Sequence, residues 1–122
     1  MPLAKNVMGA GISSAQARGI NGNNVNSAVT AAGTTQATAT AVTADVNSVT
    51  TATADQGVIL YNGVIGDDQV VYNATTAQIK VYPPTAGNVN QLAANTGFIL
   101  ASYTGVLCKK VTSTQWLGFL SA

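Results

Sequence analysis

Strand-like patterns of hydrophobic and polar residues fill the chain from residue 34 onward. In Gln78–Tyr82 the apolar residues Ile79 and Val81 alternate with polar positions, which is the period of a half-buried strand. We predict strands over residues 37–41, 46–51, 57–61, 69–73, 78–82, 91–93, 98–101, 106–111 and 115–120. Turn residues separate these segments, for example Asn62-Gly63 and Pro83-Pro84.

Short strands at this spacing are typical of a sandwich, a jelly roll or a small barrel. The best local signal is a hairpin that joins 57–61 to 69–73. The pattern therefore predicts an all-β fold, with a small β-sandwich or jelly-roll-like domain over residues 34–122. Trp116 stands among apolar neighbours and is expected in its core.

Residues 1–33 have a different pattern, with Gly or Asn every few positions. One short helix over residues 15–18 is compatible with the sequence, because a Ser precedes it and Gly19 follows it. We interpret residues 1–33 as an extended N-terminal arm that becomes ordered on a partner, or else as a tail without a docking role. Its expected anchors are the apolar residues Ile12, Ile20, Val25 and Val29.

Charge is scarce along the chain. Charged residues make up 7% of the sequence, against about 25% in an average protein. A neutral polar surface repels its own copies weakly, and a net charge near zero favours association. The composition thus favours a chain that packs against other chains, although a secreted domain with a low-charge surface would share it.

The residue types argue against catalysis. The chain has no His, and its acidic residues are all Asp. The lone Cys108 lacks a histidine base, and zinc sites need sets of Cys or His ligands. Asp67-Asp68 could bind calcium if carbonyl groups joined them, but such a pair after Gly is usually a turn. We predict no catalytic residues, no cofactor and no metal.

Nucleic acid and membranes are also not expected as partners. Lys109-Lys110 is the only cluster among five basic residues, whereas nucleic-acid binding needs several clustered cations. No apolar run approaches the roughly 18 residues needed to cross a bilayer. The first residues lack a continuous apolar stretch, so no signal peptide is expected.

Several segments together resemble a module of tailed-bacteriophage capsid decoration (cement) proteins. The resemblance covers about residues 33–120 and depends on the order and spacing of its pieces. Those pieces are residues 33–39, 43–51, 57–60, 66–67, 70–73, 81–84, 90–95 and 113–116.

This resemblance implies a structural virion protein that decorates and stabilises the capsid. It would bind the major capsid protein, assemble as a homotrimer, and lie on the capsid surface after synthesis in the host cytoplasm. The arm residues Ile12, Ile20, Val25 and Val29 would contact the capsid. One alternative is a receptor- or glycan-binding module of a head or tail fibre, which would present its tyrosines at one end. A secreted adhesin-like domain is a further alternative.

Overall fold

The described part of the chain is built from β-strands and one short 3-10 helix. The structure is a computed structural model that describes residues 24–121. Its elements are β1 (Val25–Thr30), η1 (Gln36–Thr38), β2 (Thr40–Ala41), β3 (Val46–Thr51), β4 (Gly57–Ile59), β5 (Asp68–Asn73), β6 (Ile79–Tyr82), β7 (Asn88–Val89), β8 (Phe98–Leu100), β9 (Gly105–Lys110) and β10 (Gln115–Leu120). The expectation of an all-β fold is confirmed.

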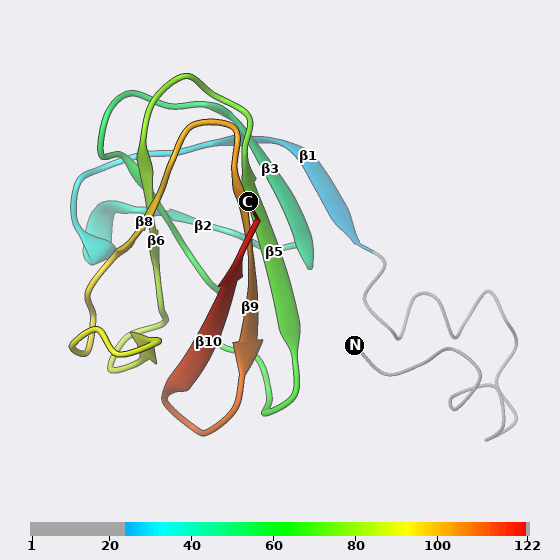
Figure 1. The fold of residues 1–122 in the computed structure, drawn as a ribbon, viewed down its shortest axis with the longest axis vertical. Helices are drawn as coiled ribbons and strands as arrows, with labels where there is room; N and C mark the ends of the chain where they lie inside the picture. Colours follow the sequence, from blue (N-terminus) through cyan, green and yellow to red (C-terminus); the bar gives the residue numbers. More distant parts are fainter. Residues whose placement is uncertain (1–23, 122) are drawn as a thin grey trace, which may run out of the picture.

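The strands form two sheets, and the chain crosses between them after almost every strand (Figure 1). The six-stranded sheet has the order β1-β3-β5-β9-β10-β7, and the four-stranded sheet has the order β2-β4-β6-β8. β1, β3 and β5 pair in parallel, and so do β2, β4 and β6. Each pair of consecutive strands in this part is therefore one coil of a β-solenoid-like winding.

The predicted sandwich or jelly-roll arrangement is wrong in this respect. A jelly roll is built from antiparallel strands joined by Greek-key connections. Here antiparallel strand pairing occurs where β8 joins β6 and where β9 lies between β5 and β10, and Ala32 and Gly57 form an isolated antiparallel bridge. The strand pattern could not reveal this difference, because both arrangements bury one face of each strand.

The predicted hairpin between residues 57–61 and 69–73 is also wrong. β4 belongs to the four-stranded sheet and β5 to the six-stranded sheet. The loop between them carries the chain from one sheet to the other, and each strand pairs with strands distant in sequence. A short loop with turn residues suits a hairpin and a sheet-to-sheet crossing equally well, so the local signal was ambiguous.

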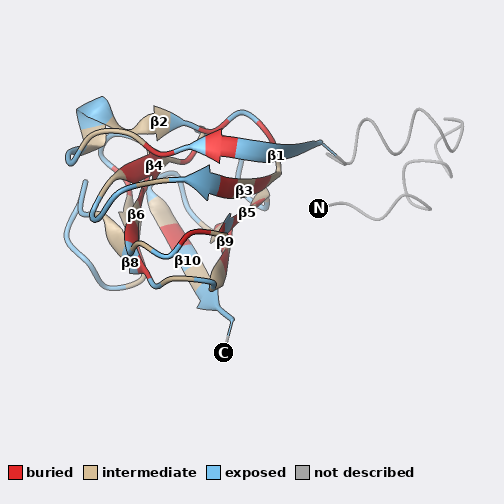
Figure 2. Cartoon of the chain, turned by 90° about the horizontal axis from the view of Figure 1, so that it is seen from above, coloured by how far each residue is buried: buried red, intermediate tan, exposed pale blue. Residues whose placement is uncertain are grey.

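The core lies between the two sheets. Figure 2 shows buried segments on the strands of both sheets, whereas most of β1 is exposed. β-Branched residues dominate because they fit the pleated, half-buried surface of a strand. The core cluster is formed by Val29, Ala31, Val42, Val49, Val58, Leu60, Val71, Ile79, Val81, Val89, Leu100, Val106, Cys108 and Trp116.

The boundary between arm and domain lies earlier than predicted. β1 is an edge strand of the six-stranded sheet and pairs in parallel with β3. Val29 is buried in the core, and Ala31 donates its backbone N–H to Thr51 O at 2.9 Å. Residues 25–33 therefore belong to the β domain, because β1 covers the open edge of β3. The expected helix over residues 15–18 lies outside the described residues.

Candidate interaction surface

An apolar row crosses the outer face of the six-stranded sheet. Val25 pairs with Val46, Val46 with Val70, Val70 with Leu107, and Leu107 with Phe119. Paired residues in a sheet point to the same side, so these five side chains form one continuous line. Val25 and Phe119 at its ends are 64% and 55% exposed, and the middle three are half-buried. We call this line the apolar row.

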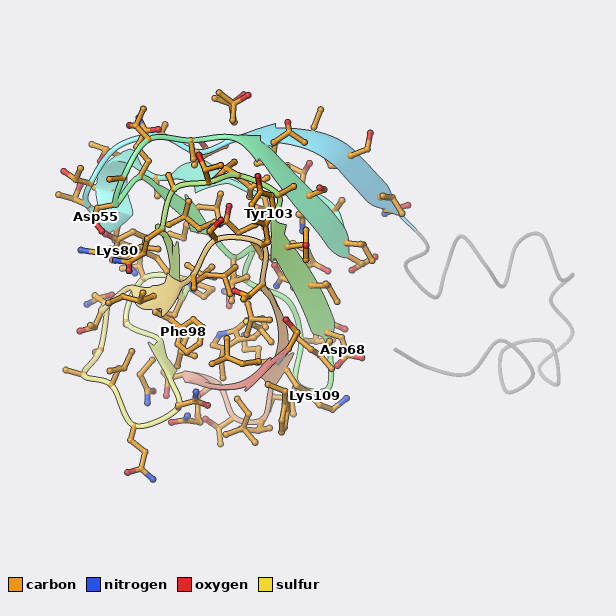
Figure 3. The ribbon with its side chains drawn as sticks, turned by 45° about the horizontal axis from the view of Figure 1, so that its top comes forward. Asp55, Asp68, Lys80, Phe98, Tyr103 and Lys109 are labelled. Atoms are coloured by element: carbon orange, nitrogen blue, oxygen red, sulfur yellow. The ribbon has the colours of Figure 1, made fainter. Side chains whose placement is uncertain are left out.

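The row is flanked on one side by a line of paired residues that contains an ion pair. Asp68 pairs with Lys109, and Lys109 pairs with Leu117, along the line next to the apolar row. Lys109 Nζ lies 3.0 Å from Asp68 Oδ1. Figure 3 shows these two side chains together at one end of the sheet, with Tyr103 well removed from them.

Two exposed tyrosines lie on the other side of the apolar row. Tyr72 pairs with Gly105, and its ring lies over that glycine: a Cβ on Gly105 would be 3.2 Å from Tyr72 Cδ1. Tyr72 donates its hydroxyl to the carbonyl oxygen of Tyr103 at 3.3 Å. Of the other two tyrosines, Tyr82 is buried, whereas Tyr61 is half-buried and donates to Asp45. Of the four tyrosines that were expected to lie together at one end of the domain, Tyr72 and Tyr103 are in contact with each other.

A second apolar feature is the loop between β4 and β5, which we call the apolar loop (residues 62–67). Val64 and Ile65 at its tip are 71% and 64% exposed. Asp67 closes the turn, since its Oδ2 accepts from Val64 N at 2.9 Å and its N–H donates to Val64 O at 3.0 Å. Gly66 N donates to Lys110 O at 2.8 Å. These bonds hold the tip in a fixed conformation.

A buried lysine anchors the same loop from below. Lys110 is 6% exposed, and its Nζ donates to Asn62 Oδ1 and to Gly63 O, both at 2.7 Å. The ammonium also lies 5.9 Å from the centroid of the Trp116 ring. A buried charge needs such acceptors, because losing its hydration without them would be costly. Lys110 therefore connects the apolar loop to the core.

Replacing this lysine should loosen the loop. Lys110→Met keeps the length of the side chain but leaves Asn62 and Gly63 without their donor, so we expect a loss of about 1–3 kcal/mol of unfolding free energy in urea. Lys80→Met is the matched control, because Lys80 lies on β6 of the other sheet, and its cost should stay within about 0.5 kcal/mol. Amide exchange at Gly66 should accelerate only in the Lys110 variant. Equal effects of both substitutions would contradict the anchoring role.

The structure describes two of the four predicted contact residues, and it places them in different environments. Val25 lies at one end of the apolar row, on the exposed face. Val29 is a core residue, so its prediction as a capsid contact is wrong: its side chain packs between the sheets. Ile12 and Ile20 lie outside the described residues.

Sequence reasoning missed the rest of the apolar row and the apolar loop. Val46, Val70, Leu107 and Phe119 could have been noticed as apolar residues on the face of each strand opposite to its core residues, such as Val71 on β5 and Trp116 on β10. Their alignment depends on register, which the sequence does not reveal.

The reactive groups of the described chain are dispersed. Burial raises the pKa of the Cys108 thiol to about 12, so it stays protonated at neutral pH. Burial, and then the hydrogen bond to Asp45, raise the pKa of the Tyr61 phenol. Within residues 24–121 no three His, Cys, Asp or Glu side chains gather as a metal site would require. No helix in this range is long and apolar enough to span a bilayer.

Neither the known protein families nor the curated proteins contain one that is significantly similar to this chain. The resemblance to decoration proteins therefore stays a prediction.

Proposed function

We propose that this chain is a structural virion protein that decorates and stabilises the capsid of a tailed bacteriophage. It would bind major capsid subunits as a homo-oligomer and act through contact alone. The observation that carries the proposal is the apolar loop, which presents two exposed apolar side chains on a backbone fixed by hydrogen bonds. The target is proposed from the resemblance over residues 33–120.

A fixed apolar tip suits this role for an energetic reason. Association costs the ordering of loops and side chains at the interface, and a preorganised loop has already lost that freedom. Val64 and Ile65 can therefore enter an apolar recess of a capsid subunit at a small entropic cost. Many copies on one shell would together stabilise it against the pressure of packaged DNA.

Co-sedimentation with undecorated capsids tests the proposal. The full chain should bind in a saturable way, and the double variant Val64→Ser/Ile65→Ser should lose most of that binding. Ile99→Ser is the control, because Ile99 is similarly exposed on β8 of the other sheet. Absence of binding by the full chain would refute the capsid as the target.

A deletion variant separates the loop from the arm. Only residues 1–23 should be removed, because a longer deletion would take away β1 and the buried Val29. If binding survives this deletion but not the loop substitutions, the contact belongs to the β domain. If the deletion alone abolishes binding, the contact belongs to the arm.

A glycan-binding module is the second candidate function. The adjacent, exposed Tyr72 and Tyr103 favour it, because exposed aromatic rings with nearby hydroxyl groups suit sugar stacking. A glycan screen should then detect binding that Tyr103→Ala removes. Binding that is unchanged in this variant would exclude the tyrosine pair as the site.

A further inference from the structure

We infer that the outer face of the six-stranded sheet packs against the same face of a second copy of this chain. The inference rests on the proposed function only in treating the chain as one that assembles. Its surface is the apolar row with its two flanking lines, and it excludes the apolar loop. A twofold axis along the strands, between β5 and β9, describes the pairing.

The side chains on this face are complementary in size about that axis. The rotation places β5 over β9 of the second copy and β3 over β10. Val70 then meets Leu107, and Val46 meets Phe119, so each smaller side chain faces a larger one. Alternation of large and small residues across facing positions is how apolar layers interdigitate.

The charges are complementary about the same axis. Asp68 and Lys109 pair across β5 and β9 within one chain. The rotation brings Asp68 of one copy over Lys109 of the other, and the reverse, so four charges alternate in sign. On the opposite flank Tyr72 and Gly105 are related by the same rotation, and the Tyr72 ring of each copy lies over its own Gly105. An isologous contact of this kind is self-complementary, as a twofold dimer requires.

The available area fits a weak dimer. Four strands about 4.8 Å apart and roughly 20 Å long offer roughly 400 Å² of flat surface per copy. Because the side chains project from this flat surface, the accessible area that the two copies bury together approaches the roughly 1,000 Å² at which specific interfaces begin. We therefore expect a twofold dimer that forms in the micromolar range, instead of the homotrimer implied by the resemblance.

Sedimentation velocity of the full chain across the micromolar range tests this pairing. Phe119→Ser should weaken dimerisation at least about tenfold, because it removes the largest side chain of the row. Ile99→Ser is the matched control, with 54% exposure against 55% for Phe119, and it should leave the dimer unchanged. A monomer throughout, a trimer, or equal effects of both substitutions would overturn the inference. Urea denaturation checks that each variant is folded.

A charge exchange distinguishes contacts between copies from contacts within one. The Lys109→Asp variant and the Asp68→Lys variant should each dimerise at least about tenfold more weakly than the original chain. In each homodimer, residues 68 and 109 would then face one another across the interface with like charges. An equimolar mixture of the two variants should form heterodimers, although the pair within each chain stays repulsive. Absence of heterodimers would contradict the proposed twofold axis between β5 and β9. Dimers without capsid binding would refute the proposed function alone. Capsid binding by a strict monomer would refute this inference and the homo-oligomer, and would keep the capsid as the target.

Discussion

Trp116→Ala is expected to lower the unfolding free energy by about 3–5 kcal/mol. Trp116 is 1% exposed and is the largest fully buried side chain in the described chain. It lies on β10, between β9 and β7, so its removal would leave a cavity where three strands meet. A typical domain has only about 5–15 kcal/mol of stability, and the variant would therefore be close to unfolding.

Urea denaturation followed by far-ultraviolet circular dichroism measures this loss. Leu117→Ala is the control, because Leu117 is the next residue on the same strand and points to the exposed outer face. Its cost should stay below about 1 kcal/mol. Similar losses in both variants would contradict the assignment of Trp116 to the core.

Asn73→Ala is expected to cost roughly 3 kcal/mol, although it removes no apolar group. Asn73 is fully buried at the end of β5. Its Nδ2 lies 2.7 Å from Ala77 O and 3.2 Å from both Leu100 O and Ala101 O. Its Oδ1 accepts from Thr75 N at 3.0 Å and from Thr75 Oγ1 at 2.7 Å. The substitution would leave several buried polar groups without partners.

Asn26→Ala is the matched control for this network. Asn26 is exposed on β1, and its Oδ1 accepts only a local bond from Ala28 N at 3.2 Å. Its loss should change stability by no more than about 0.5 kcal/mol in the same urea titration. If the Asn73 variant is as stable as the Asn26 variant, the network does not hold β5 to the β8–β9 turn.

The strands themselves were predictable, because alternation along the chain is a local property. β3 spans Val46–Thr51 and β10 spans Gln115–Leu120, as the pattern predicted. The short elements were harder to predict from the sequence. The predicted strand over residues 37–41 is reduced to β2, because the hydroxyl groups of Thr35 and Thr38, 2.8 Å apart, close the turn of η1.

The order of the strands was not predictable from local signals. β1 pairs with β3, and β3 with β5, and in each case a strand of the other sheet intervenes in the sequence. Such parallel coils depend on contacts between distant segments, whereas turn signals describe only neighbours. The same limit explains why β1 was assigned to the arm.

The interaction surface follows from that order. The sequence identified Val25, but the apolar row exists only because register aligns Val25 with residues on four further strands. The apolar loop was visible as Val64-Ile65 between two glycines. Its exposure could not be read from the sequence, because buried turns can carry the same residues.

The heat stability of the capsid tests the central claim most directly. Undecorated, DNA-filled capsids are warmed with and without saturating amounts of the full chain, and DNA release is followed with an intercalating dye. We expect the chain to raise the temperature of DNA release, and the Val64→Ser/Ile65→Ser variant to raise it much less. If the temperature of DNA release is unchanged at a saturating concentration of the chain, the chain does not stabilise the capsid.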